Sequence, residues 1–205
     1  MGLLNSRLNA RRFHVEGELP ENFREIYRDN LQKSSFVEPP NVTAEAVIGW
    51  TDISNMLSSE FENFNTWYVG EWILFGMRID KRSIPAAKLK AEINLRCAKW
   101  AQENGVERCP GSVRADIKET IQAEWLPRVM PKTVMHEVAW NVSTNRLYFS
   151  THSDAAGDVL RKRFFMTFGR KIYPLGPLAW IDDEQIFNAV LSAPPTAIAI
   201  GGPRR

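Results

Sequence analysis

Residues 84–128 read IPAAKLKAEINLRCAKWAQENGVERCPGSVRADIKETIQAEWLPR, and this stretch decides the fold because it predicts two consecutive helices. In its first half, apolar residues recur at spacings of three and four, which places them on one stripe of a helix. These residues are Ala86, Leu89, Ile93, Cys97 and Trp100. After the break at residues 104–111, a second stripe is made by Val113, Ile117, Ile121 and Trp125, with Ser112 as the expected N-cap. Two helices joined by so short a loop are expected to pack antiparallel, as a long helical hairpin over residues 84–126.

A two-residue period replaces the helical one after Leu126-Pro127. Every second residue from Val134 to Trp140 is expected on one face, and the alternation returns in residues 147–151. This segment therefore predicts a β-hairpin with one buried face and a turn at residues 141–145. Ser153 is the expected N-cap of a following helix that ends at Gly169. In that helix Phe164 and Phe165 are both expected in the core.

The N-terminal half adds further strands. Residues 11–15 fit a short strand, residues 46–52 a second, and residues 66–80 the strongest β stretch, with a turn at Gly70-Glu71. A helix is expected to open at Leu19-Pro20. Strands on both sides of a helical block, without repeated strand–helix alternation, predict an α+β fold with a mainly antiparallel sheet.

We expect one domain over residues 1–180, from which the helical hairpin protrudes, and a C-terminal tail over residues 181–205. In the tail, residues 186–191 fit a short helix and residues 198–200 fit an edge strand.

Charge is unevenly distributed along the chain, although the 205 residues carry a net charge of only +2. Residues 16–71 hold three basic and eleven acidic side chains, whereas residues 72–132 hold twelve basic and seven acidic ones. Residues 161–171 hold five basic side chains and no acidic one. A positive half of this kind can meet phosphates, and neutralising phosphates makes affinity fall steeply with salt.

Candidate DNA-binding residues are the basic side chains of the helical hairpin, of the Leu-Pro-Arg corner and of the last helix. They are Lys81, Arg82, Lys88, Lys99, Arg128, Lys132, Arg161, Lys162, Arg163, Arg170 and Lys171. The five positive charges in residues 161–171, with no local acidic partner, repel one another unless an anion lies near. The alternative is that these residues only complement helix dipoles or stay solvated, and that Arg128 bonds to exposed carbonyls at a helix end.

Several motifs come at intervals that resemble those of the recombination-associated RdgC proteins of bacteria. The motifs are Ile84-Pro85, Leu126-Pro127-Arg128, Trp140, Ser153, Leu160, Gly169 and Pro174-Leu175. Upstream, Ile48-Gly49-Trp50 and the stretch from Trp72 to Ile79 are similar to strands of that family, so the resemblance covers residues 40–178. The agreement in spacing matters more than any single motif.

The resemblance implies an RdgC-like fold and a protein that binds double-stranded DNA without sequence specificity, forms a ring-like homodimer and restrains the RecA recombinase. The chain departs from the family because it lacks the C-terminal third, which contributes to the ring. It also carries Met130 where an aromatic residue usually follows the Leu-Pro-Arg corner. Flexible apolar side chains suit adaptable interfaces, so Met130 is the expected dimer contact. A cytoplasmic, nucleoid-associated protein without a cofactor is expected.

Catalysis is not expected, because no catalytic pattern is complete. Asp182-Asp183-Glu184 is the one dense acidic group, and three consecutive carboxylates near a helix start are more typical of a solvated cap than of a metal site. His14, His136 and His152 are widely separated, and no phosphate-binding glycine-rich loop occurs. Cys97 and Cys109 are expected to be reduced thiols rather than metal ligands.

Two other functions stay open. An interaction protein on the same fold, for instance in a phage or mobile-element setting, would bind a recombinase or another protein through its acidic N-terminal half and its many aromatic residues. A metal-dependent exonuclease is the third reading.

No apolar run approaches the roughly 20 residues that span a bilayer, and residues 1–10 lack the apolar core of a signal peptide, so no membrane contact is expected.

Overall fold

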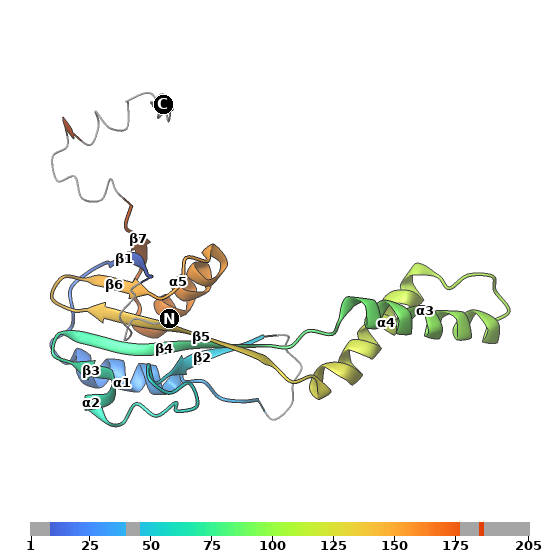
Figure 1. Cartoon of the computed structure of the whole chain (residues 1–205), viewed down its shortest axis with the longest axis horizontal. Helices are drawn as coiled ribbons and strands as arrows, with labels where there is room; N and C mark the ends of the chain where they lie inside the picture. The colour runs from blue at the N-terminus through green and yellow to red at the C-terminus, as the bar shows by residue number, and fades with distance from the viewer. Residues whose placement is uncertain (1–8, 40–45, 177–184, 187–205) are drawn as a thin grey trace, which may run out of the picture.

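The computed structural model describes residues 9–39, 46–176 and 185–186, and seven strands in this part of the chain form one antiparallel sheet (Figure 1). The strands are β1 (Arg11–Val15), β2 (Ala46–Thr51), β3 (Tyr68–Val69), β4 (Trp72–Lys81), β5 (Lys132–Asn141), β6 (Arg146–Phe149) and β7 (Ile172–Pro174). Their order is β2-β4-β5-β6-β1-β7, and β3 also pairs with β4. The five helices of the same residues are α1 (Phe23–Lys33), α2 (Phe64–Trp67), α3 (Ala86–Glu103), α4 (Gly111–Trp125) and α5 (Asp154–Phe168), and a 3-10 turn, η1 (Leu126–Arg128), follows α4. The prediction of an α+β fold with an antiparallel sheet is confirmed.

A long two-stranded ribbon forms the centre of the sheet. β4 and β5 are ten residues each and pair over their whole length, from Trp72 opposite Asn141 to Lys81 opposite Lys132. The predicted hairpin follows, because β5 turns back into β6, with Val138 opposite Phe149 and Trp140 opposite Leu147. These four side chains are all fully buried, as the two-residue period predicted.

Helices α1 and α5 cover the same face of the sheet (Figure 1). Tyr27 of α1 and Phe168 of α5 both contact the ring of Trp140, with centroids 5.6 and 5.7 Å apart. Trp50 of β2 reaches the same layer, because its indole Nε1 donates a hydrogen bond of 2.8 Å to Thr167 of α5. An aromatic core of this size supplies most of the apolar burial that stabilises the sheet.

The capping residues at both ends of α5 were predicted correctly. The Ser153 hydroxyl accepts a hydrogen bond from the amide of Ala156, and Gly169 ends the helix in the left-handed conformation with φ of 66°. The expected burial was wrong for one of the two phenylalanines. Phe164 is fully buried, but Phe165 is 50% exposed, because it lies about 100° further around the helix.

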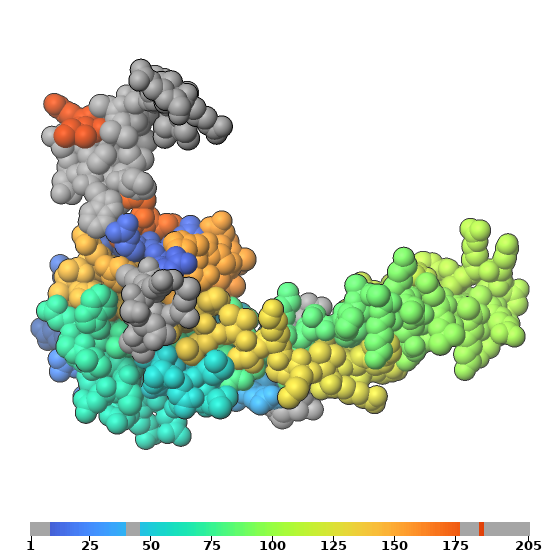
Figure 2. All heavy atoms as spheres, in the orientation of Figure 1, coloured from blue at the N-terminus to red at the C-terminus, as the bar shows by residue number. Residues whose placement is uncertain are grey.

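Helices α3 and α4 pack against each other at a distance from the main core (Figures 1 and 2). Their own small core contains Ile93, Cys97 and Ile121, which are all buried. The second helix begins at Gly111, so the expected N-cap at Ser112 was wrong, and no side chain caps this end. The N-terminal helix likewise begins later than expected, at Phe23 rather than at Leu19-Pro20.

No helix in the described part of the chain is both long enough and apolar enough to cross a membrane. The predictions made for residues 198–200 and for Asp182-Asp183-Glu184 lie outside the described residues, as does most of the tail over residues 181–205.

Candidate nucleic-acid interface

Two of the predicted basic residues lie directly opposite each other at the end of the β4–β5 ribbon. Lys81 and Lys132 are cross-strand partners, so both side chains leave the same face of the sheet. Both are exposed, and like charges in this arrangement destabilise a sheet. Arg128 is also exposed and lies in η1, four residues before Lys132. We call Lys81, Arg128 and Lys132 the neck cations, because they lie where the sheet meets the α3–α4 pair (Figure 1).

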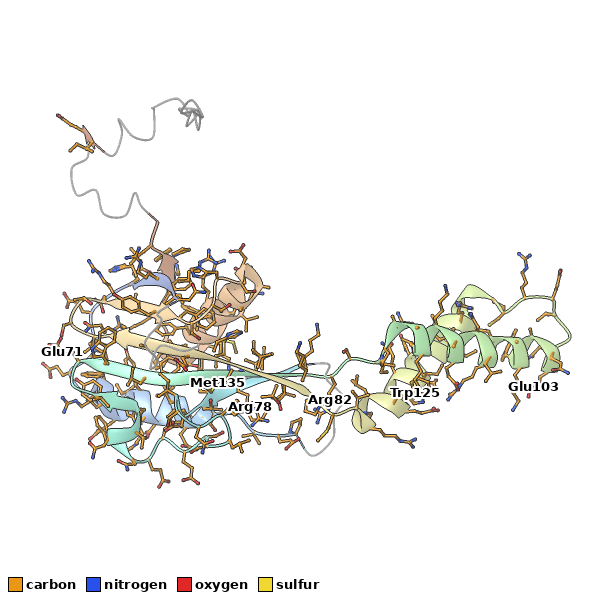
Figure 3. All side chains as sticks on the ribbon, viewed as in Figure 1. Glu71, Arg78, Arg82, Glu103, Trp125 and Met135 are labelled. Atoms are coloured by element: carbon orange, nitrogen blue, oxygen red, sulfur yellow. The ribbon has the colours of Figure 1, made fainter. Side chains whose placement is uncertain are left out.

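Arg82 has a different role from its neighbour Lys81. It is only 7% exposed, its Nε donates a hydrogen bond of 3.0 Å to the carbonyl oxygen of Val129, and its guanidinium lies 3.6 Å from Glu38. Figure 3 shows Arg82 at the junction between the ribbon and the helices. The guanidinium therefore connects the segment that follows β4 to the segment that precedes β5, and it is not available to a phosphate.

Lys88 and Lys99, the two predicted binding residues of α3, are exposed, and each has a weak contact with a neighbouring side chain. The Lys88 ammonium lies 5.0 Å from the ring centroid of Trp125, and the Lys99 ammonium lies 3.9 Å from Glu103. Exposed contacts of these kinds are weak and leave the ammonium groups accessible to solvent and to anions. Arg96, in contrast, is held by Glu92 and Glu124 at 2.9 and 2.7 Å. These hydrogen bonds raise the pKa of Arg96, and the same arginine lowers the pKa of Glu124.

Three residues of the last basic cluster line one groove beside the C-terminal half of α5. The groove has a volume of about 530 Å³, and its walls come from α5 and from the segment that leads into β7. It is lined by Asp158, Arg161, Lys162, Phe165, Lys171, Ile172 and Tyr173. We call it the α5–β7 groove. Lys162 and Lys171 are exposed, and Arg161 forms an ion pair with Asp158.

The other two basic residues of that cluster point into the protein. Arg163 donates a hydrogen bond of 3.0 Å to the carbonyl oxygen of Ser34 and lies over the ring of Trp50, and burial lowers its pKa. Arg170 donates hydrogen bonds to the Tyr27 hydroxyl at 2.7 Å and to the carbonyl oxygen of Glu16 at 3.0 Å.

The expectation of five charges without local partners was therefore wrong. Arg161 has an acidic partner, and Arg163 and Arg170 have neutral ones. Helix α5 and the following loop keep two exposed lysines without a described ion-pair partner, Lys162 and Lys171.

The sequence reasoning missed two residues of this surface, Phe165 and Tyr173. Phe165 was expected in the core, although it lies four residues after Arg161 and therefore on the same stripe of the helix. Tyr173 was not considered, because nothing in its local sequence distinguishes an exposed strand tyrosine from a buried one. It is 46% exposed, and its hydroxyl lies 3.3 Å from a carboxylate oxygen of Glu16.

Exposed apolar side chains are spread over the described part of the chain, and two of them lie close in sequence to Arg128 and Lys132. Met130 is 91% exposed, and Val134, close by at the start of β5, is 38% exposed. Both side chains are exposed to solvent, and the dimer contact expected for Met130 stays a prediction.

Candidate catalytic or metal-binding residues do not converge in the described residues. No three His, Cys, Asp or Glu side chains gather there in an arrangement that would hold a metal ion. His136 contacts the ring of Phe149, and burial lowers its pKa, whereas His152 bonds to Asn9. His14 lies on β1 opposite Arg146.

A scan against protein-family models finds no match for this chain, and a search of curated proteins finds none either.

Proposed function

We propose that this protein binds double-stranded DNA through its phosphates, without sequence specificity, and modulates homologous recombination in the manner of the RdgC family. The observation that carries the proposal is the pair of lysines at the neck. Lys81 and Lys132 face each other across two paired strands, and no described acidic residue forms an ion pair with either. Such a pair lowers stability in the free protein and becomes favourable when an anion binds between the two charges.

Five other exposed cations among the predicted residues add candidate phosphate contacts at other places on the protein. Arg128 lies in the turn before Lys132, Lys88 and Lys99 lie along α3, and Lys162 and Lys171 lie in the α5–β7 groove. Lysine ammonium groups act as point charges that contact phosphates in any sequence. The proposal therefore omits Arg82, Arg163 and Arg170, whose guanidinium groups are occupied by the protein itself.

On this proposal the α3–α4 pair corresponds to the long antiparallel helical hairpin of the RdgC family. The protein would act as a homodimer with Met130 in the contact, on bacterial nucleoid DNA in the cytoplasm, and would restrain a RecA-type recombinase by occupying the duplex. The exposed side chains of Met130 and Val134 support the dimer, because flexible or small apolar groups can pack against a second copy.

A gel-shift titration on duplex DNA at two salt concentrations, with and without magnesium, tests the proposal. We expect binding that weakens steeply with salt, does not require magnesium and leaves the DNA intact. Absence of binding at low salt would overturn it. Shortened DNA in the magnesium samples would instead indicate a metal-dependent exonuclease.

A protein-interaction module is the second candidate function, and the exposed Met130 and Val134 favour it independently of the lysines. On this reading the side chains of Met130 and Val134 contact a protein such as a recombinase, and Met130→Asp abolishes that contact. The double variant Lys81→Gln/Lys132→Gln leaves Met130 and Val134 in place, so it should weaken DNA binding and keep the protein contact, and a pull-down and a gel shift with this variant separate the two functions.

A further inference from the structure

The α5–β7 groove combines exposed aromatic rings with exposed ammonium groups. Phe165 and Tyr173 are 50% and 46% exposed, and both line the groove together with Lys162 and Lys171. Large aromatic side chains are usually placed in a core, where their burial stabilises the fold. Two of them in one solvent-filled groove therefore point to a ligand with an apolar, flat surface.

The core of the protein does not need either ring. Phe164 and Phe168 of the same helix are buried against Trp140, with ring centroids 5.3 and 5.7 Å away, so α5 is already anchored. Phe165 lies about 100° around the helix from Phe164 and is half exposed, so it contributes less to the core than Phe164 and Phe168 do. The hydroxyl of Tyr173 lies 3.3 Å from a carboxylate oxygen of Glu16, which restricts the orientation of the ring.

The charges in the groove favour an anionic ligand. Among the described residues that line the groove, Asp158 is the single acidic one, and it is paired with Arg161, so Lys162 and Lys171 supply a net positive charge. A flat apolar surface attached to an anion is the chemistry of a nucleotide, whose base stacks on aromatic rings while its phosphate meets lysines.

We propose that the α5–β7 groove binds an unpaired nucleotide, with the base stacked on Phe165 or Tyr173 and the phosphates held by Lys162 and Lys171. The inference rests on the proposed DNA-binding function and specifies its substrate. Bases inside a duplex are stacked on one another and cannot stack on a side chain. The groove therefore directs the protein to single-stranded stretches, overhangs or frayed ends of the DNA that the neck cations hold.

Fluorescence anisotropy with the full chain tests this assignment. The probes are a labelled oligo(dT) of about 12 nucleotides, within the range of single-strand site sizes, and a blunt duplex of the same length. At least one of Phe165→Ala and Tyr173→Ala should weaken binding to oligo(dT) about ten-fold, as expected for the loss of one stacked base. Binding to the blunt duplex should change less than two-fold. Phe165→Trp should restore the oligo(dT) affinity, because tryptophan keeps a stacking surface.

Met166→Ala is the matched control, because Met166 is an adjacent and 80% exposed apolar residue of α5 that does not line the groove. It should leave both affinities unchanged. Competition by free thymidine monophosphate distinguishes two sources of the nucleotide. Displacement of oligo(dT) at micromolar concentration assigns the groove to free nucleotides. If the monophosphate does not displace oligo(dT) but the aromatic substitutions weaken its binding, the groove binds a nucleotide within single-stranded DNA.

Unchanged oligo(dT) binding in Phe165→Ala and Tyr173→Ala overturns the assignment. If blunt-duplex binding through the neck persists in that case, only the groove assignment fails. If single-strand binding depends on the groove but duplex binding is absent at low salt, the proposed duplex-binding function fails and the groove assignment stands.

Discussion

Neutralising the opposed lysines of the neck should have opposite effects on folding and on DNA binding. Lys81 and Lys132 are cross-strand partners, for which the Cβ atoms lie about 5 Å apart. With ammonium groups about 6 Å apart in water, their repulsion amounts to about 0.7 kcal/mol. Lys81→Gln and Lys132→Gln should therefore each stabilise the protein by up to this amount.

The double variant provides the sharper comparison. Either single substitution already removes the whole repulsion, so the double variant should be no more stable than the single ones, with a coupling energy of about 0.7 kcal/mol in the double-mutant cycle. The effects on DNA should instead add. Each lysine that neutralises one phosphate contributes about 0.9 to the slope of log affinity against log salt, so the double variant should lose about 1.8.

Urea unfolding followed by tryptophan fluorescence measures the first quantity, and anisotropy with duplex DNA over a series of salt concentrations measures the second. Lys33→Gln is the control, because Lys33 is an exposed lysine in the last turn of α1, away from the neck. It should leave the salt slope unchanged. The reasoning is refuted if both single variants lose stability, or if the salt slope of the double variant equals that of the unmodified protein.

Three further predictions follow from individual contacts. Asp80→Asn should lower the free energy of unfolding by about 3–5 kcal/mol at pH 7, because it removes one partner of a buried ion pair in which Asp80 accepts hydrogen bonds of 2.7 and 2.8 Å from Arg78. Arg78 lowers the pKa of Asp80 in the folded protein. The stabilisation is therefore present above the unfolded pKa of about 4 and is lost as pH falls through the lower folded pKa. At such low pH the variant and the wild-type protein should have similar free energies of unfolding in urea. Gly49→Ala should cost about 3 kcal/mol or more in the same assay, because its Cβ would lie 2.2 Å from the Cα of Phe36, a backbone atom that cannot move away. Cys109 should react with iodoacetamide more slowly than an unhindered thiol at pH 8 in a mass-spectrometric time course, because burial and its contact with another thiol raise its pKa.

Each of these predictions has a control in the same chain. Asp29→Asn removes an exposed ion pair and should change stability by less than about 1 kcal/mol. Gly111→Ala places a Cβ in open space at the start of α4 and should be neutral or stabilising by up to about 1 kcal/mol. Cys97 is 5% exposed and should stay unmodified until the protein unfolds. Equal effects of a variant and its control would contradict the contact assigned to that residue.

The parts of the fold that sequence could predict are those with short-range causes. Ser153 caps α5 through an amide three residues away, and Gly169 ends it through its own backbone conformation. The β5–β6 hairpin follows from a period of two around a four-residue turn, residues 142–145. In each case the interacting groups are close in sequence, so the local pattern contains the whole reason for the structure.

The candidate site was less predictable, because its residues are sorted by long-range contacts. Arg163 and Arg170 look like their neighbours in sequence, but their partners are Ser34 and Tyr27, 129 and 143 residues away. A count of local charges cannot tell an arginine that bonds to such a distant group from one that faces solvent. For the same reason Phe165 was placed in the core, since only the position of the sheet beneath α5 decides which stripe of the helix is buried.

The neck is the exception, because there the distant partner follows from the topology. β4 and β5 form one long antiparallel ribbon, and the α3–α4 pair is inserted between them in place of a turn. The ribbon pairs without a bulge from Trp72 to its last residue, so the residue at which β4 ends must face the residue at which β5 begins. Once the two strands are known to pair, Lys81 and Lys132 are forced together whatever their charge. Lysine at both positions causes a repulsion that glutamine at either one would remove, and the proposed binding of a polyanion would give both charges a function.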